Sequence, residues 1–323
     1  MNEFAGEPGI AKVGVIGLGT MGGSMARHLL GTGYPVIGCD VEPARLAAFA
    51  VMGGVPAASP AEVAAKADAV VLSLPSVRAF EEVTAGLLEA AQQGLIVIET
   101  STLPLAVKQR GHQQLAGRGV TLLDCPISGT GAQMAVKDIA IYTSGDPAAL
   151  ARARPVLAAF SRTQFDLGGF GNGSKLKFVA NLLVAIHNAS TAEALLVAEQ
   201  AGLDLQTTFQ ALTAGAGTSR MLEIRGPMMI GGDYSDATMR VQTFQKDLDI
   251  IASFARELGC PAPLFSTAAQ LNLAALAQGH ANDDTASVFA VLRQFAGAGP
   301  VEPAAPGPGP AQPSAGPGRG PAQ

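Results

Sequence analysis

A glycine-rich turn between an apolar run and a helical segment is the feature that most constrains how this chain can fold. Residues 12–18 (KVGVIGL) have the composition of a buried strand, and residues 24–31 have the pattern of a helix. Gly17, Gly19 and Gly22 lie between them with the spacing G-x-G-x-x-G. In a strand–turn–helix unit, such glycines permit a tight turn, an approach of an anion to the backbone and close packing of the helix. The motif therefore predicts the start of an α/β domain.

The rest of the first half alternates between apolar strands and alanine-rich helices. Continuous apolar runs are typical of parallel strands that are covered on both faces. Such runs occur at residues 35–40, 69–74, 95–99, 120–124 and 139–143. Helical stretches separate some of them, for example at residues 60–67 and 79–91. This alternation predicts an α/β fold with a Rossmann-type doubly wound parallel sheet.

The pattern changes near Gly168, and no strand is expected beyond it. Residues 174–200 form one apolar stretch of helical periodicity. Further helices are expected at residues 205–214, 239–258, 265–278 and 285–295. We therefore expect a Rossmann domain at residues 1–168 and a second, all-α domain at residues 169–296, joined by a long interdomain helix. Residues 297–323 are nearly all Pro, Gly and Ala, and we expect them to form a disordered tail.

The glycine loop and an acid that follows it predict a dinucleotide site. A helix N-terminus directs free N–H groups and a partial positive charge toward an anion such as a pyrophosphate. The predicted contacts from the loop are Gly17, Leu18, Gly19, Thr20, Met21 and Gly22. Asp40 ends the second predicted strand, about twenty residues later, where a carboxylate accepts from the ribose 2′-OH. Because an acid repels the 2′-phosphate of NADP, NAD is favoured, although the nearby Arg45 leaves NADP open as the less favoured cofactor. The alternative is a glycine turn without a ligand.

Composition and charge argue against several other classes of protein. The net charge of −5 provides no basic footprint for nucleic acid, and three Tyr without any Trp offer little surface for base stacking. The uncharged run at residues 178–192 is too short for a membrane span and contains Asn181 and Asn188. The N-terminus lacks the pattern of a signal peptide, and the three cysteines have no metal-ligand spacing. We therefore expect a cytoplasmic protein with no metal and no nucleic-acid or membrane partner.

Several segments, in the same order, resemble the motifs of one enzyme family. Residues 15–30 (VIGLGTMGGSMARHLL) resemble the signature of the 3-hydroxyisobutyrate dehydrogenase family of β-hydroxyacid dehydrogenases, which is related to 6-phosphogluconate dehydrogenases. The further matches are residues 72–76 (LSLPS, a cofactor-side loop), 124–129 (DCPISG, a substrate loop), 171–181 (GNGSKLKFVAN, a catalytic helix) and 245–248 (QKDL). The resemblance covers roughly residues 12–295. It implies a helical domain for substrate binding and dimerisation, a homodimer or homotetramer, and oxidation or reduction of a 3-hydroxy acid without a metal.

Lys177 stands at the catalytic lysine position of this family. It lies six residues after Gly171 and would take the hydroxyl proton in oxidation and return it in reduction. Partial burial and the positive nicotinamide ring of NAD⁺ would both lower the pKa of this lysine. Asn181 lies four residues further on the same helix face, where it would hold the substrate hydroxyl or orient the lysine. Lys175 points about 200° away around the helix and is not expected to share this role.

The resemblance also implies the other contacts with substrate and cofactor. Ser128, Gly129 and Thr130 match the substrate loop, where hydroxyl and backbone N–H groups would hold a small carboxylate. The family commonly has glycine where this chain has Thr130, which leaves the identity of the substrate open. Ser101 is a second substrate-binding candidate. The expected cofactor-side contacts are Leu74, Pro75, Thr102 and Lys246.

Two other functions are weighed against a dehydrogenase. An imine reductase would have the same architecture, but its catalytic lysine position is usually occupied by another residue type. A non-catalytic NAD-binding protein would keep the glycine loop, but it would have no need of Lys177 and Asn181. Arg220 and Arg225 stay open, either as contacts with an acidic substrate or as structural ion pairs. The sequence therefore favours an oxidoreductase that uses NAD and a small 3-hydroxy acid or its semialdehyde.

Overall fold

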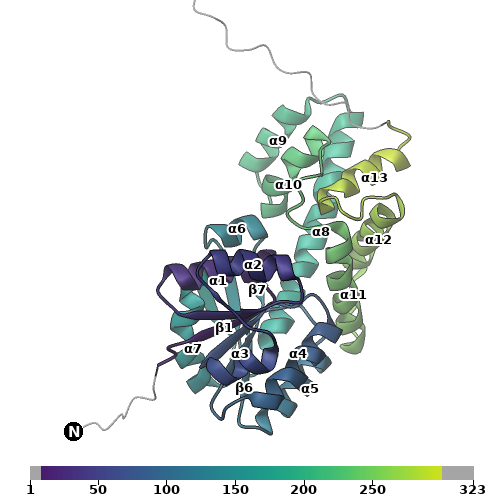
Figure 1. The fold of residues 1–323 in the computed structure, drawn as a ribbon. Coiled ribbons are helices and arrows are strands. Elements are labelled where there is room, and N and C mark those ends of the chain that lie inside the picture. The colour runs from purple at the N-terminus through teal and green to yellow at the C-terminus, as the bar shows by residue number, and fades with distance from the viewer. Residues whose placement is uncertain (1–8, 300–323) are drawn as a thin grey trace, which may run out of the picture.

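A parallel sheet of six strands forms the centre of the first half of the chain (Figure 1). The computed structural model describes residues 9–299. The strands lie in the order β3-β2-β1-β4-β5-β6, so the chain moves outward from β1 first in one direction and then in the other. Their bounds are β1 (Val13–Ile16), β2 (Val36–Cys39), β3 (Val55–Pro56), β4 (Ala69–Leu72), β5 (Ile96–Glu99) and β6 (Thr121–Asp124). The helices of this half are α1 (Thr20–Gly31), α2 (Pro43–Val51), α3 (Pro60–Lys66), α4 (Val77–Ala90), α5 (Leu105–Ala116), α6 (Gly131–Ala135) and α7 (Pro147–Phe160).

The central strands are buried on both faces of the sheet. Every residue of β1, β2, β4 and β5 is buried. Val13 and Val15 pack into one apolar cluster, whereas Ile16 packs into a second cluster on the other face. Both faces therefore require apolar side chains, which explains why these strands appear in the sequence as continuous apolar runs. The prediction of a doubly wound parallel sheet is confirmed.

The strand expected at residues 139–143 belongs to a separate sheet of three strands. β8 (Ala140–Thr143) pairs antiparallel with β7 (Ile127–Ser128) and parallel with β9 (Thr163–Asp166). Between β7 and β8 the only helix is α6, which has five residues. This connection lacks the helical crossover that joins parallel neighbours, and the two strands pair antiparallel instead. The parallel sheet accordingly ends at β6.

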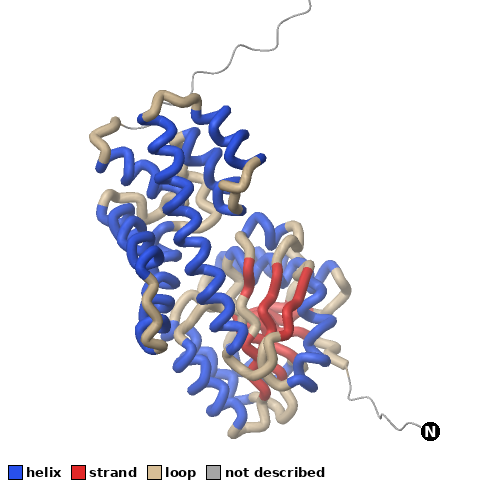
Figure 2. Tube along the Cα trace, turned by 180° about the vertical axis from the view of Figure 1, so that it is seen from behind, coloured by secondary structure: helices blue, strands red, loops and turns tan. Residues whose placement is uncertain are grey.

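The described part of the second half is built from helices (Figure 2). α8 (Asn172–Gln200) spans 29 residues, begins against β6, β7 and β8, and continues through the helical half. The helices packed around it are α9 (Leu205–Ala214), α10 (Arg220–Gly231), α11 (Val241–Glu257), α12 (Pro263–Ala277) and α13 (Val288–Phe295), the last preceded by a 3-10 turn at Thr285–Ser287. An all-helical second half with a long connecting helix is confirmed. The helix α10 was not expected, because Gly226 and Pro227 interrupt its pattern.

The domain boundary expected near Gly168 falls between the last strand and the long helix α8. The last strand ends at Asp166 and α8 begins at Asn172, on either side of the domain boundary expected near Gly168.

α8 has the length and hydropathy of a membrane span. It nevertheless packs against five other helices, as the central helix of a helical domain does. Of the tail expected at residues 297–323, the part from residue 300 onward lies outside the described residues.

Candidate active site

The glycine loop between β1 and α1 has no room for larger side chains at two of its three glycines. Gly17 has a φ of +89°, and a Cβ there would overlap the carbonyl oxygen of Ser73. A Cβ at Gly22 would overlap the carbonyl oxygen of Gly17. At Gly19, by contrast, the nearest atom to an added Cβ is 3.7 Å away, and this residue begins α1 without a side-chain cap. The free N–H groups of the first turn of α1 are therefore available to an anion.

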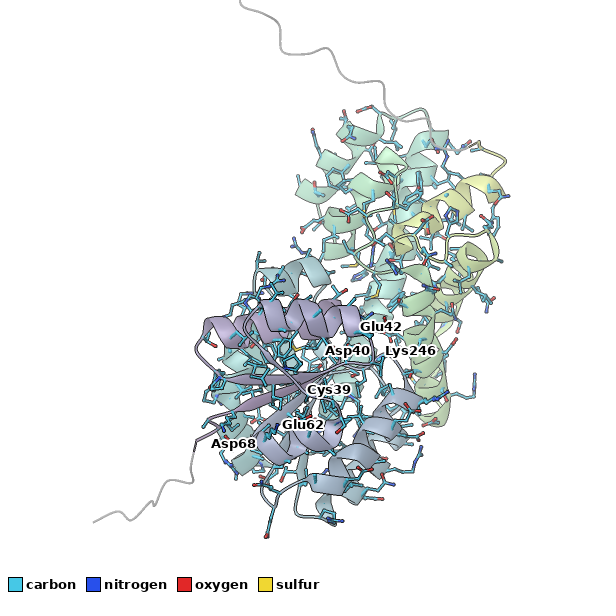
Figure 3. All side chains as sticks on the ribbon, in the orientation of Figure 1. Cys39, Asp40, Glu42, Glu62, Asp68 and Lys246 are labelled. Carbon is cyan, nitrogen blue, oxygen red and sulfur yellow. The ribbon has the colours of Figure 1, made fainter. Side chains whose placement is uncertain are left out.

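Asp40 is held at the end of β2, beside the glycine loop. One of its carboxylate oxygens accepts from the Leu18 N–H at 2.6 Å, and the other accepts from the Glu42 N–H at 2.9 Å. Arg45, whose side chain is half exposed, places Nη1 3.5 Å from the same carboxylate. Figure 3 shows Asp40 on the side of the sheet that faces Lys246. The carboxylate is thus fixed where the sequence predicts contact with a ribose.

A pocket lies where the carboxyl ends of the strands meet the helical half. It has a volume of about 170 Å³, and side chains from both halves of the chain line it. The lining residues are Met21, Ser73, Leu74, Thr100, Ser101, Thr102, Ile127, Lys177, Met239, Thr243, Lys246 and Asp247. Sites in doubly wound folds form at this edge of the sheet. Six of the residues predicted from the sequence therefore meet in one place: Met21, Leu74, Ser101, Thr102, Lys177 and Lys246.

Lys177 is the only lysine of α8 that reaches this pocket. Its side chain is buried, and this burial is the largest cause of a lowered pKa. The positive charge of Lys246 also lowers the pKa of Lys177, whereas the negative charge of Asp247 raises it without reversing the net shift. Lys175 is exposed and donates from Nζ to the Asn172 Oδ1 at 3.1 Å. The divergence of the two lysines that helix geometry predicts is therefore observed.

Asn181 does not line the pocket, but it forms a hydrogen bond to Asp247, which does. Asn181 donates from Nδ2 to the Asp247 Oδ2 at 2.9 Å. Lys246 lies 3.2 Å from the other carboxylate oxygen and donates to the Thr102 carbonyl at 2.8 Å. This chain of contacts crosses from the helical half to the loop after β5. Asp247 is the centre of this chain of contacts; it belongs to the matched QKDL segment at residues 245–248, but the sequence analysis did not select it as a site residue.

The other predicted residues take different positions around the pocket. Ser101 accepts from the Leu74 N–H through its hydroxyl at 2.8 Å, so it fixes the two cofactor-side loops to each other. Pro75 is exposed and does not line the pocket. Arg220 pairs with Glu223, and the buried Arg225 pairs with Asp284 at 3.1 Å. Neither arginine lines the pocket, and both are in structural ion pairs.

The predicted substrate loop lies next to the pocket rather than in its wall. Of the matched segment at residues 124–129 only Ile127 lines the pocket, while the predicted contacts Ser128, Gly129 and Thr130 do not. The Thr130 hydroxyl caps α6 by accepting from the Gln133 N–H at 3.3 Å, and the Gln133 side chain accepts from the Thr130 N–H at 3.0 Å. Thr130 is therefore used to begin α6. Within residues 9–299, no group of three His, Cys, Asp or Glu side chains is placed to hold a metal ion.

Two family models match adjacent segments of the chain. The model described as the NAD binding domain of 6-phosphogluconate dehydrogenase matches residues 12–169. The model described as the NAD-binding domain of NADP-dependent 3-hydroxyisobutyrate dehydrogenase matches residues 171–292. The two models together cover both halves of the structure.

Relatives and solved structures match over most of the chain. The chain is 37% identical to L-threonate dehydrogenase of Cupriavidus necator over 285 residues, which are 87% of this chain and 96% of the relative. It is 32% identical to L-threonate dehydrogenase of Escherichia coli K12 over 285 residues, 87% of this chain and 94% of the relative. The crystal structure of 3-hydroxyisobutyrate dehydrogenase from Salmonella typhimurium matches with a TM-score of 0.79 and 32% identity, covering 87% of this chain and 99% of that one. An imine reductase from Pseudomonas sp. shares the fold at 21% identity, with a TM-score of 0.58 and coverage of 87% of this chain and 99% of that one.

Proposed function

We propose that this chain, which belongs to the 3-hydroxyisobutyrate dehydrogenase-like family of β-hydroxyacid dehydrogenases, transfers a hydride between NAD and a small 3-hydroxy acid or its semialdehyde. Family membership makes it an NAD(P)-dependent hydroxyacid dehydrogenase. The observation that carries the finer proposal is Lys177, a buried lysine of lowered pKa in the pocket between the two halves. Lys177 is the general acid and base in this proposal.

The glycine loop and Asp40 support NAD rather than NADP as the cofactor. The open space at Gly19 and the uncapped start of α1 fit a pyrophosphate. The Asp40 carboxylate would receive the ribose 2′-OH and would repel a 2′-phosphate. Arg45 is the nearby cation that would favour NADP, but in the structure it is turned onto Asp40.

The proposed reaction separates a hydride from a proton. Bound NAD⁺ supplies the acceptor for the hydride that leaves the alcohol carbon. Lys177, neutral before the reaction, takes the hydroxyl proton on Nζ as the carbonyl forms, and returns a proton in the reverse direction. Asp247 stabilises the charged lysine that results, because an opposite charge favours the protonated form. Asn181 fixes that carboxylate by donating a hydrogen bond to it.

The pocket lining supports a small acid that carries several hydroxyl groups. The lining includes the hydroxyl-bearing residues Thr102, Thr243 and Ser101, and Lys246 adds a positive charge next to Asp247. Met239 and Ile127 provide a smaller apolar surface. Two relatives are named for L-threonate, a four-carbon sugar acid, and a structural neighbour is named for 3-hydroxyisobutyrate. We propose a four-carbon sugar acid as the first substrate to test.

A substrate screen tests the proposed function. Purified protein is mixed with NAD⁺ or NADP⁺ and with L-threonate, 3-hydroxyisobutyrate or glycerate, and the absorbance of the reduced nicotinamide is followed. The proposal predicts turnover with NAD⁺ and at least one of these acids. Reduction of cyclic imines with NADPH, together with inactivity on every acid, would contradict it. Tight binding of NAD without turnover of any acid or imine would favour a non-catalytic NAD-binding protein.

A further inference from the structure

Three charged side chains lie fully buried behind the pocket. Glu99 ends β5 and Asp124 ends β6, and the two residues are direct partners in the register of these parallel strands. Lys108, on α5, lies between them: it forms an ion pair with Glu99 and donates to the Asp124 Oδ1 at 2.8 Å. All three side chains have no exposed surface. Burial alone lowers the pKa of Lys108, but Asp124 and Glu99 outweigh it and raise that pKa, so the lysine stays charged.

Lys108 and Glu99 bind the backbone of Ser101, which lies in a loop that lines the pocket. The third donor of Lys108 reaches the Ser101 carbonyl at 2.7 Å. Glu99 accepts from the Ser101 N–H at 2.9 Å, so both backbone polar groups of this residue are bound. The Ser101 hydroxyl in turn accepts from the Leu74 N–H. With three partners, the ammonium group of Lys108 has used every donor it has.

The cluster also holds the start of the helix that carries Lys177. The N-cap residue of α8 is Gly171, which has a left-handed φ of 94° and provides no side-chain cap. The cap comes instead from β6: Asp124 accepts from the Ser174 N–H and from the Ser174 hydroxyl, both at 2.7 Å. Lys177 lies three residues after Ser174, on nearly the same side of the helix. The carboxylate that pairs with Lys108 is therefore also the one that fixes the first turn of α8.

We propose that Lys108 is a positioning residue, which holds the Ser101 loop and the first turn of α8 in one fixed arrangement through its contacts with Asp124 and Glu99. Without Lys108, the buried Asp124 carboxylate has no cation beside it, whether or not Glu99 is also charged, and this strongly disfavours its charged form. Asp124 then no longer caps α8 as a fixed anion, and Lys177 moves away from its buried position. The proposal rests on the proposed function only in that Lys177 is taken as the reacting group.

The titration of Lys177 reports this coupling without any substrate. The charged groups that act on Lys177 are Asp247 and Lys246 of α11, while Ser101 and Thr102 line the same pocket and are neutral. Burial is the largest cause of its lowered pKa. If the helix start is released and Lys177 becomes more exposed, its pKa rises toward the ordinary lysine value.

The experiment measures the pH dependence of acetylation of Lys177 by acetic anhydride, with peptide mass spectrometry as the readout. The variants are Lys108→Met and the double variant Glu99→Gln/Lys108→Met, which keeps the net charge of the buried cluster and avoids two facing carboxylates. Leu115→Ala is the matched control, because Leu115 is fully buried two turns further along α5. It lowers the melting temperature without touching the cluster.

The proposal predicts that the titration of Lys177 moves up by about one pH unit in both Lys108 variants. At neutral pH the fraction of neutral lysine, and with it kcat for oxidation, then falls about tenfold. The Leu115→Ala variant keeps the native titration. A native titration in a folded Lys108 variant overturns the proposal, and so does an equal shift in Leu115→Ala. If neither Lys108 variant folds while Leu115→Ala does, the cluster serves stability alone and the proposal is wrong. Failure of the native protein to oxidise any acid would instead contradict the proposed function and leave the labelling result valid.

Discussion

Replacing Gly173 with alanine tests how closely the position of Lys177 depends on the seating of α8. The added Cβ would lie 2.5 Å from the carbonyl oxygen of Tyr142 and 2.7 Å from that of Asp124. A carbon and a carbonyl oxygen in contact are separated by about 3.3 Å, so the helix has to retreat by about 0.8 Å. Both obstructing oxygens belong to the backbone of strands, which cannot rotate away as a side chain would. Lys177 is four residues further on the same helix face and moves with Gly173.

A displacement of this size at the proton-transfer group is expected to lower kcat about 100-fold. Overpacking at the helix start is expected to lower the free energy of unfolding by about 1–3 kcal/mol. Steady-state kinetics with the acid found in the screen measures the first quantity, and urea denaturation measures the second. Gly231→Ala is the matched control, because nothing lies within 4 Å of the Cβ position there. A folded Gly173→Ala protein with native kcat would refute the reasoning.

Three further predictions concern the cofactor, the pH profile and a buried ion pair. Asp40→Asn removes the charge that repels a 2′-phosphate, so the ratio of kcat/KM for NAD over NADP should fall about tenfold in steady-state assays; an unchanged ratio would show that Asp40 does not select the cofactor. Because only neutral Lys177 accepts the hydroxyl proton and its pKa is lowered, kcat/KM for oxidation should rise with pH, and the midpoint of the rise should lie below 10.5, the ordinary lysine pKa. Asp247→Asn removes a charge that raises that pKa, so the rise should move to lower pH, and a move to higher pH would contradict the assignment. Arg225→Met leaves Asp284 buried without its cation and should lower the free energy of unfolding by about 3–5 kcal/mol in urea denaturation; because neither residue lines the pocket, kcat of the folded enzyme should be unchanged, and a large loss would reopen a role for Arg225 in substrate binding.

The fold was predictable where one local requirement dominates the residue choice. Gly17 is needed for its own left-handed φ of +89°, and Gly22 for its contact with the Gly17 carbonyl oxygen inside the loop, so the motif alone predicts the turn. The strands of the parallel sheet need apolar side chains on both faces, which leaves continuous runs in the sequence. β3 and β7 have two residues each and are too short to show any pattern. α10 was missed for a different reason, since Pro227 lies inside the helix and argues against it locally.

The site was predictable only in part, because tertiary contacts decide which polar residues matter. Lys177 follows from a motif and from helix spacing, and its burial agrees with the choice over Lys175. Asp247 and Lys108 are different cases. A lysine or an aspartate on a helix usually faces water, and nothing in the local sequence indicates that these two are buried. Their importance arises from contacts between strands and helices that are far apart in sequence but adjacent in the fold.

The measurement that tests the central claim most directly compares kcat of Lys177→Ala with that of Lys175→Ala. The two lysines belong to the same helix, but only Lys177 lines the pocket. We expect kcat of Lys177→Ala to fall about 100- to 10,000-fold, because the proton acceptor is removed. The variant should still bind NADH, because its glycine loop is unchanged. Lys175→Ala should keep the native kcat. Native turnover by a folded Lys177→Ala protein would contradict the role of this lysine as the general acid and base.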